Sequence, residues 1–96
     1  MIKKGESSPL LHEVVLTFTT DPGASVFVVG SFNEWNASST PLEEAAPGEF
    51  RVTLRLPSGE HEYKFVCNGR WQADPNAKAW APNPFGSLNS RVIVKD

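Results

Sequence analysis

Apolar and polar residues alternate along much of this chain with a period of two. Residues 11–20 place Val14, Leu16 and Phe18 on one side of the segment, and residues 50–56 (FRVTLRL) alternate without a break. Successive side chains of a β-strand point to opposite faces, so this pattern predicts strands. No segment has the apolar spacing of an amphipathic helix.

Other segments carry weaker signals. Residues 25–29 (SVFVV) form an unbroken apolar run, which predicts a strand buried on both faces or nearly so. A last strand is expected from about residue 89 to 95. Residues 37–48 are expected to form a surface connection with one short extended piece. Residues 72–87 (QADPNAKAWAPNPFGS) are predicted to be a Pro-rich loop without regular structure, and a loop that long in a compact domain is usually functional.

Residues 63–71 (YKFVCNGRW) predict a β-hairpin. Asn68-Gly69 favours a two-residue turn, because both turn positions need a positive φ that these residues tolerate. The resulting register places Val66 opposite Trp71, and Lys64 shares their face. The other face, which we expect to point into the core, carries Tyr63, Phe65 and Cys67. An outward aromatic beside a hydrogen-bond donor is suited to stacking on a ligand, and sugars are the leading candidates.

Six or seven short strands with close turn signals predict an all-β, antiparallel β-sandwich. A length of 96 residues corresponds to one domain, which we expect over residues 11–96, after a flexible N-terminal tail over residues 1–10. Because the chain begins with Met, we expect it to be complete and to lack a separate catalytic domain.

Composition narrows the choice of partner and compartment. The chain is 40% hydrophobic and 21% charged with a net charge of −2, so neither nucleic acid nor an anionic membrane is an expected partner. The lone Cys67 is expected to be a small buried apolar residue. The N-terminal residues lack the apolar run of a signal peptide, and no stretch reaches transmembrane length, which favours a cytoplasmic location.

Residues for catalysis or metal binding are not grouped in the sequence. His12 and His61 are far apart, and no Cys/His/Asp cluster has the spacing of a metal site. The acidic pairs at 43–44 and at 60 and 62 fall in turn and surface contexts, not in the pocket that glycosidase chemistry needs. We therefore expect no enzyme activity, no metal and no other cofactor.

Four segments, in order, carry a resemblance to a known family. They are VFVVGSFNEWN (26–36), LPSGEHEYKFVCNGRW (56–71), the Asp-Pro at 74–75, and FGSLNS (85–90). The chain resembles the family-48 carbohydrate-binding modules, in particular the glycogen-binding domains of AMP-activated protein kinase β subunits. The resemblance implies an immunoglobulin-like, early-set sandwich that presents a flat site to α-1,4-linked glucose chains.

The resemblance also implies roles for individual residues. Trp35 and Trp71 would be stacking platforms for glucose rings. Lys64 and Asn89 would donate hydrogen bonds to sugar hydroxyls. Hairpin parity independently places Lys64 and Trp71 together.

The segment near the C-terminus completes the expected site. Phe85 would pack against or into the curved glucan, with Ser87 beside it. Phe32 is expected to belong to the core. Trp80 has no clear counterpart in the family, and a loop anchor, a glucan contact and a partner surface stay open for it.

Two functional classes follow from these residues. The first is non-catalytic binding of glycogen, starch or maltooligosaccharides, by a targeting or adaptor module for a glycogen-metabolism enzyme or kinase-like partner. The second is a protein-interaction domain on the same sandwich scaffold. The joint presence of the four residues proposed to stack on or bond to sugar favours the first class.

Overall fold

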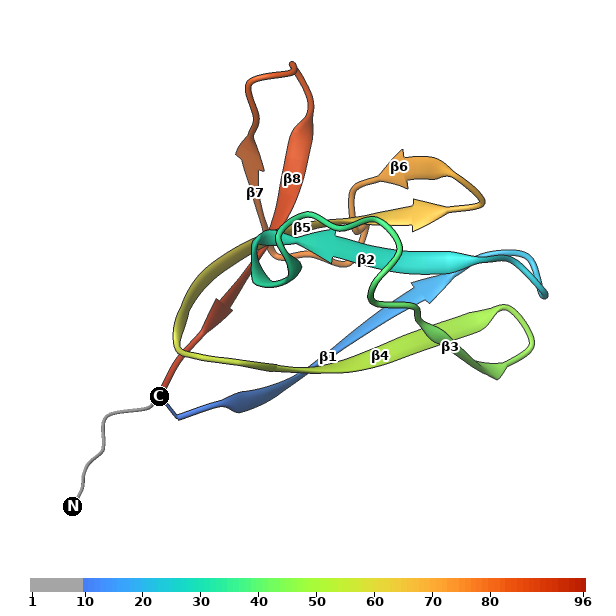
Figure 1. Cartoon of the computed structure of the whole chain (residues 1–96), viewed down its shortest axis with the longest axis horizontal. Helices are drawn as coiled ribbons and strands as arrows, with labels where there is room; N and C mark the ends of the chain where they lie inside the picture. Colours follow the sequence, from blue (N-terminus) through green and yellow to red (C-terminus); the bar gives the residue numbers. More distant parts are fainter. Residues whose placement is uncertain (1–9) are drawn as a thin grey trace.

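The computed structural model of the chain describes residues 10–96. Within that range the chain forms two antiparallel sheets, which confirms the predicted all-β sandwich (Figure 1). The strands are β1 (His12–Thr19), β2 (Val26–Gly30), β3 (Glu43–Ala46), β4 (Glu49–Leu56), β5 (Gly59–Cys67), β6 (Arg70–Gln72), β7 (Ala79–Pro82) and β8 (Leu88–Val94), and a 3-10 turn, η1 (Ser31–Asn33), follows β2. The predicted N-terminal tail lies outside the described residues except for Leu10, which is exposed.

The core lies between a three-stranded sheet, β1-β4-β3, and a larger sheet in which β2, β5, β8 and β7 are neighbours and β6 pairs with β5. Both alternating segments behave as predicted: Phe18 lies opposite Phe50 in the β1–β4 ladder, and both are buried. From the other sheet Phe65 meets Phe18, with ring centroids 4.9 Å apart. The buried cluster consists of Leu16, Phe18, Val26, Val28, Leu42, Phe50, Tyr63, Phe65 and Cys67. Phe32 packs against this cluster as a partly buried residue, as expected.

The hairpin register is confirmed. Val66 pairs with Trp71 and Phe65 with Gln72, and the two turn residues, Asn68 and Gly69, have φ values of 51° and 83°. The side chain of Asn68 also accepts a hydrogen bond from the backbone N–H of Ser25, which ties the turn to the start of β2. Local turn chemistry therefore fixes the position of Trp71.

β5 is the central strand of the larger sheet, and three other strands pair with it. Its second half pairs with β2 along one edge, from Tyr63 to Cys67. The opposite edge is shared: β8 pairs with residues 59–63, and β6 pairs with residues 65–67. Beyond Tyr63, β8 leaves β5 and continues with β7 as a projecting hairpin (Figure 1). Lys64 thus lies at the point where β6 and β8 separate.

One sequence prediction is wrong. Residues 72–87 are not a structureless loop, because residues 79–82 form β7 and pair antiparallel with β8. Residues 79–82 are extended because they pair with β8. Pro82 is tolerated because it is the last residue of an edge strand, where a missing backbone N–H breaks no ladder hydrogen bond. Trp80 lies on β7, 43% exposed, rather than anchoring a loop. It pairs with Ser90, and so it points to the core-side face of the sheet, opposite to Lys64.

A buried polar contact fixes the segment that leads into β7. The Tyr63 hydroxyl donates to Asp74 Oδ2 at 2.6 Å, and the backbone N–H of Asp74 donates to Ser90 Oγ at 2.7 Å. Asp74 Oδ1 accepts from the backbone N–H of Asn76. Burial raises the pKa of the Tyr63 phenol well above its usual value, and the hydrogen bond to Asp74 and its negative charge raise it further.

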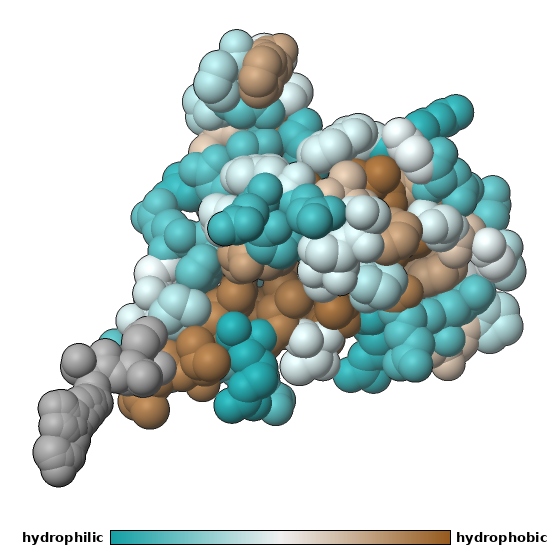
Figure 2. Space-filling view, in the orientation of Figure 1, coloured by the Kyte–Doolittle hydropathy of each residue, from teal (hydrophilic) through white to brown (hydrophobic). Residues whose placement is uncertain are grey.

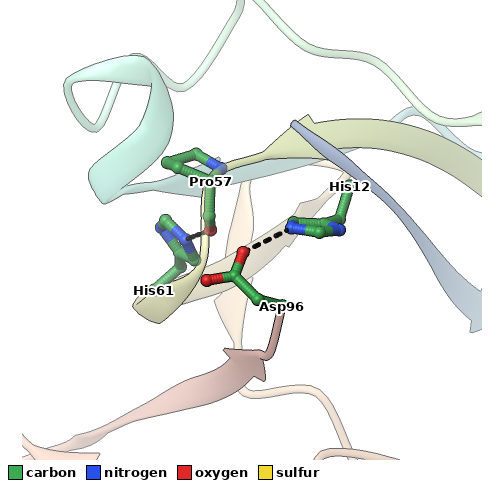
Figure 3. A network of polar contacts seen from close by, with 4 residues as sticks. All are labelled: His12, Pro57, His61 and Asp96. Carbon is green, nitrogen blue, oxygen red and sulfur yellow. Dashed lines mark hydrogen bonds and ion pairs between the residues drawn. The ribbon is translucent and has the colours of Figure 1, made fainter. Parts of the chain in front are cut away.

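The two histidines lie at the end of the sandwich where the chain finishes (Figure 3). His12 Nε2 is 3.1 Å from Asp96 Oδ1 and so joins the start of β1 to the last residue. His61 Nε2 lies 2.9 Å from the carbonyl oxygen of Pro57 and closes the β4–β5 turn. Each histidine has its own partner, and the two do not act as a pair.

Candidate functional site

A cleft of about 510 Å³ opens on the outer face of the larger sheet. All six side chains singled out from the sequence line it, although they come from four separate segments. Its lining residues are Trp35, Lys64, Trp71, Asn83, Pro84, Phe85, Ser87 and Asn89. We call it the Trp35–Trp71 cleft. It lies where β6 and β8 diverge from the shared edge of β5.

Strand parity places the floor of the cleft. Val66 and Lys64 share the outer face of β5 with Trp71 of β6, as predicted. Trp71 is 52% exposed, whereas Val66 is almost fully buried. Val29, opposite Lys64 in β2, is fully buried on the same face. The predicted burial of residues 25–29 holds for Val26, Val28 and Val29, whereas Phe27 is half-buried and Ser25 is exposed. The exposed indole sits beside an apolar, covered floor.

A strained turn presents Trp35. Both Glu34 and Trp35 have φ of 57°, which is rare for non-glycine residues and costs about 1–3 kcal/mol each. Asn33 compensates: its Oδ1 accepts from the backbone N–H of Gly30, and its Nδ2 donates to the Val28 carbonyl oxygen, both at 3.0 Å. The backbone N–H of Trp35 donates to the Gly30 carbonyl oxygen at 2.9 Å. The turn therefore holds a 39% exposed indole at the rim of the cleft.

The loop joining β7 to β8 presents Phe85. The residue is 92% exposed, and Figure 2 shows apolar atoms at the projecting end of this hairpin. Asn83 closes the loop through its backbone, which donates to the Ser87 carbonyl oxygen at 3.0 Å and accepts from the Gly86 N–H at 3.2 Å. Gly86 has φ of 82°, a conformation that glycine adopts without strain.

The polar side chains of the cleft are linked to one another. Lys64 Nζ donates to Ser87 Oγ at 2.9 Å. Asn89 Nδ2 donates to Glu62 Oε1 at 3.0 Å, and Asn89 is only 7% exposed. Asn89 therefore offers at most one amide hydrogen to a ligand, while Lys64 has further donors. Aromatic faces beside fixed polar groups can bind a ligand that is apolar on one side and hydroxylated at its rim.

A comparison with protein families gives one match that covers most of the chain. The family is described as the glycogen recognition site of AMP-activated protein kinase, and its model matches residues 12–96. The chain belongs to this family. Its membership confirms the resemblance to the glycogen-binding modules of these kinases drawn from the four sequence segments.

Curated relatives lead to the same family. Subunit beta-2 of 5'-AMP-activated protein kinase from Mus musculus is 37% identical over 76 residues, which are 79% of this chain and 27% of that protein. The beta-1 subunit from Sus scrofa is 38% identical over 76 residues, 79% of this chain and 59% of that protein. The beta-1 subunit from Rattus norvegicus is 33% identical over 94 residues, 98% of this chain and 33% of that protein. The chain thus spans only part of each relative.

Sequence reasoning gave no site role to Asn83 and Pro84, which line the cleft, or to Glu62, which accepts a hydrogen bond from Asn89. Asp74 belongs to a quoted segment, but its bond to Ser90 before β7 was not predicted. The Pro-Asn-Pro sequence at 82–84 is the one available signal for Asn83, because an asparagine side chain in a turn often accepts hydrogen bonds from backbone N–H groups a few residues later in the chain. Trp80 lies on the opposite face and does not line the cleft.

Within residues 10–96, no three His, Cys, Asp or Glu side chains gather closely enough to hold a metal ion. The same residues include no helix with the length and apolar character to cross a membrane.

Proposed function

We propose that this chain binds α-1,4-linked glucans, such as glycogen, starch and maltooligosaccharides, through the Trp35–Trp71 cleft and without catalysing a reaction. One observation carries the proposal: three exposed aromatic side chains and a set of neutral or cationic donors from four segments line one cleft. The chain's family, described as a glycogen recognition site, supports glycogen as the ligand.

The chemistry of a glucose ring suits this lining. A pyranose has an apolar face of C–H groups that stacks on an indole, and its hydroxyl rim needs fixed donors and acceptors. In this proposal Trp35 and Trp71 receive successive glucose units, and Phe85 packs against the curved chain. Lys64 and Asn89 bond to hydroxyls, with Ser87 beside them. None of these tasks requires a side chain to transfer a proton.

The proposal extends to an adaptor role in the cytoplasm. The relatives are named as beta subunits of 5'-AMP-activated protein kinase, and the matched segment is a part of each. A module of this kind would bring a kinase-like or glycogen-metabolism partner to the glucan. The partner would not need to touch the cleft, because the two-sheet sandwich has other faces.

Calorimetric titration with β-cyclodextrin and maltoheptaose tests the proposal. We expect dissociation constants on the order of micromolar to millimolar, because a shallow site orders several sugars and excludes only part of their water. Cello- and chito-oligosaccharides serve as matched controls, since their β-1,4 chains are flat and should not bind. No heat and no tryptophan fluorescence change at millimolar β-cyclodextrin would refute glucan binding and favour the protein-interaction domain.

A further inference from the structure

Asn83 lines the Trp35–Trp71 cleft, yet its side chain has no hydrogen-bonding capacity left for a ligand. Its Nδ2 donates to Ser87 Oγ at 2.7 Å and to Asn89 Oδ1 at 3.1 Å. Its Oδ1 accepts from the backbone N–H groups of Phe85 at 2.9 Å and Ser87 at 3.3 Å. An asparagine side chain offers two donor hydrogens and two acceptor lone pairs, so all four are in use.

These four bonds run in two directions. The two accepted bonds hold the backbone of the loop that carries Phe85 at its exposed tip. Of the two donated bonds, one reaches Ser87 in the same loop and the other reaches Asn89, a buried residue of β8 that lines the cleft. Ser87 Oγ also accepts from Lys64, and Asn89 donates to Glu62, so the network reaches β5. Asn83 thereby joins a projecting hairpin tip to the sheet beneath it.

We infer that Asn83 is a positioning residue for glucan binding, which sets the placement of Phe85 over the cleft before the ligand arrives. The inference rests on the proposed function. A five-residue hairpin loop with an almost fully exposed phenylalanine has little packing of its own to hold it. Ordering such a loop during binding would cost affinity, and hydrogen bonds made in the free protein remove that cost.

Asn83 therefore contributes through Phe85 and not by touching sugar. This differs from the roles of Trp35, Trp71 and Lys64, which are proposed to contact the ligand directly. It also predicts coupling: once the Phe85 ring is gone, the order of its loop should matter little to the ligand. Residues that act through one another fail to add in a double-mutant cycle.

The test measures β-cyclodextrin affinity, into the millimolar range, for the unaltered chain, Asn83→Ala, Phe85→Ala and the double variant. We expect Asn83→Ala to weaken binding by about five- to tenfold, the effect of roughly one lost net hydrogen bond or slightly more. In the Phe85→Ala background the same change should alter affinity by less than about twofold. Amide hydrogen exchange without ligand should show faster exchange at Phe85 and Ser87 in Asn83→Ala.

A matched control is Asn76→Ala, which removes an exposed asparagine side chain outside the cleft and should leave affinity unchanged. Melting temperatures confirm that each variant folds. An equal loss of affinity in both backgrounds, or no loss in Asn83→Ala, overturns the positioning role while glucan binding stands. If the unaltered chain does not bind β-cyclodextrin at all, the proposed function fails and the inference fails with it.

Discussion

Trp71→Ala is the change that tests the cleft most directly, because its effect on stability and its effect on glucan binding can be measured separately. Trp71 is 52% exposed, so about half of its surface is buried against the sheet. A fully buried tryptophan hides about 250 Å², so roughly 100 Å² of apolar contact is at stake. At about 25 cal/mol per Å² this is about 2.5 kcal/mol, and a drop of roughly 10–20 °C in melting temperature follows.

The variant should still fold, since domains of this size are stable by about 5–15 kcal/mol. Its affinity for glucans should fall as well. Stacking of a base on an aromatic side chain is worth about 1–3 kcal/mol, and the same range for a sugar predicts about a 5- to 150-fold weaker complex. Starting from micromolar to millimolar affinity, such a loss puts β-cyclodextrin binding near or beyond the limit of calorimetry.

Lys64→Gln is the contrasting variant. It keeps a donor but loses the charge, and the proposed partners are neutral hydroxyls, so affinity should fall by only about 1 kcal/mol. Stability should hardly change, because Ser87 Oγ keeps its bond from Asn83 at 2.7 Å when Lys64 is replaced. Urea unfolding and calorimetry on both variants separate the two effects. A folded Trp71→Ala that binds β-cyclodextrin within twofold of the unaltered chain refutes the stacking argument.

Two further predictions concern stability. Tyr63 is the single tyrosine of the chain, and its folded pKa lies above the unfolded value of about 10. The stability that Tyr63 contributes is therefore complete below about pH 10 and declines as the pH rises further, by up to about 1.4 kcal/mol per pH unit. Urea unfolding should show this decline, tyrosinate absorbance should report the titration, and Tyr63→Phe should remove the pH dependence. Gly30→Ala should destabilise the fold by about 1–3 kcal/mol, because a Cβ there would lie 2.5 Å from the Glu62 carbonyl oxygen and 2.7 Å from the Phe32 ring; an unchanged urea midpoint would contradict this.

Local signals made the centre of the site predictable from the sequence. Asn68-Gly69 fixes the hairpin register, and the period of two then places Lys64 and Trp71 on one face without any knowledge of the rest. Trp35, Phe85 and Asn89 were placed by family resemblance alone. No local pattern shows that Trp35, in the turn after β2, and Phe85, at the tip of a later hairpin, line the same cleft.

The missed features depend on contacts between distant segments. β7 is a strand only because β8 pairs with it, and its proline-rich sequence gives no alternation to detect. Asn83 acquires its role from the loop that this pairing creates. Asp74 belongs to a quoted motif, but its partners Tyr63 and Ser90 lie 11 and 16 residues away, beyond the reach of turn or cap rules.

The point where β6 and β8 separate along β5 lies between the core and the cleft. Tyr63 and Ser90 are the last pair of the β5–β8 ladder, and on the core side both bond to Asp74. The next residue, Lys64, points to the outer face at the point where β8 departs and the cleft opens. The buried contact with Asp74 therefore lies at the last pair of the ladder, directly beside the point where β8 and β6 separate along β5. Because side chains alternate across β5, this contact on the core side and Lys64 in the cleft are adjacent along the strand but point to opposite faces.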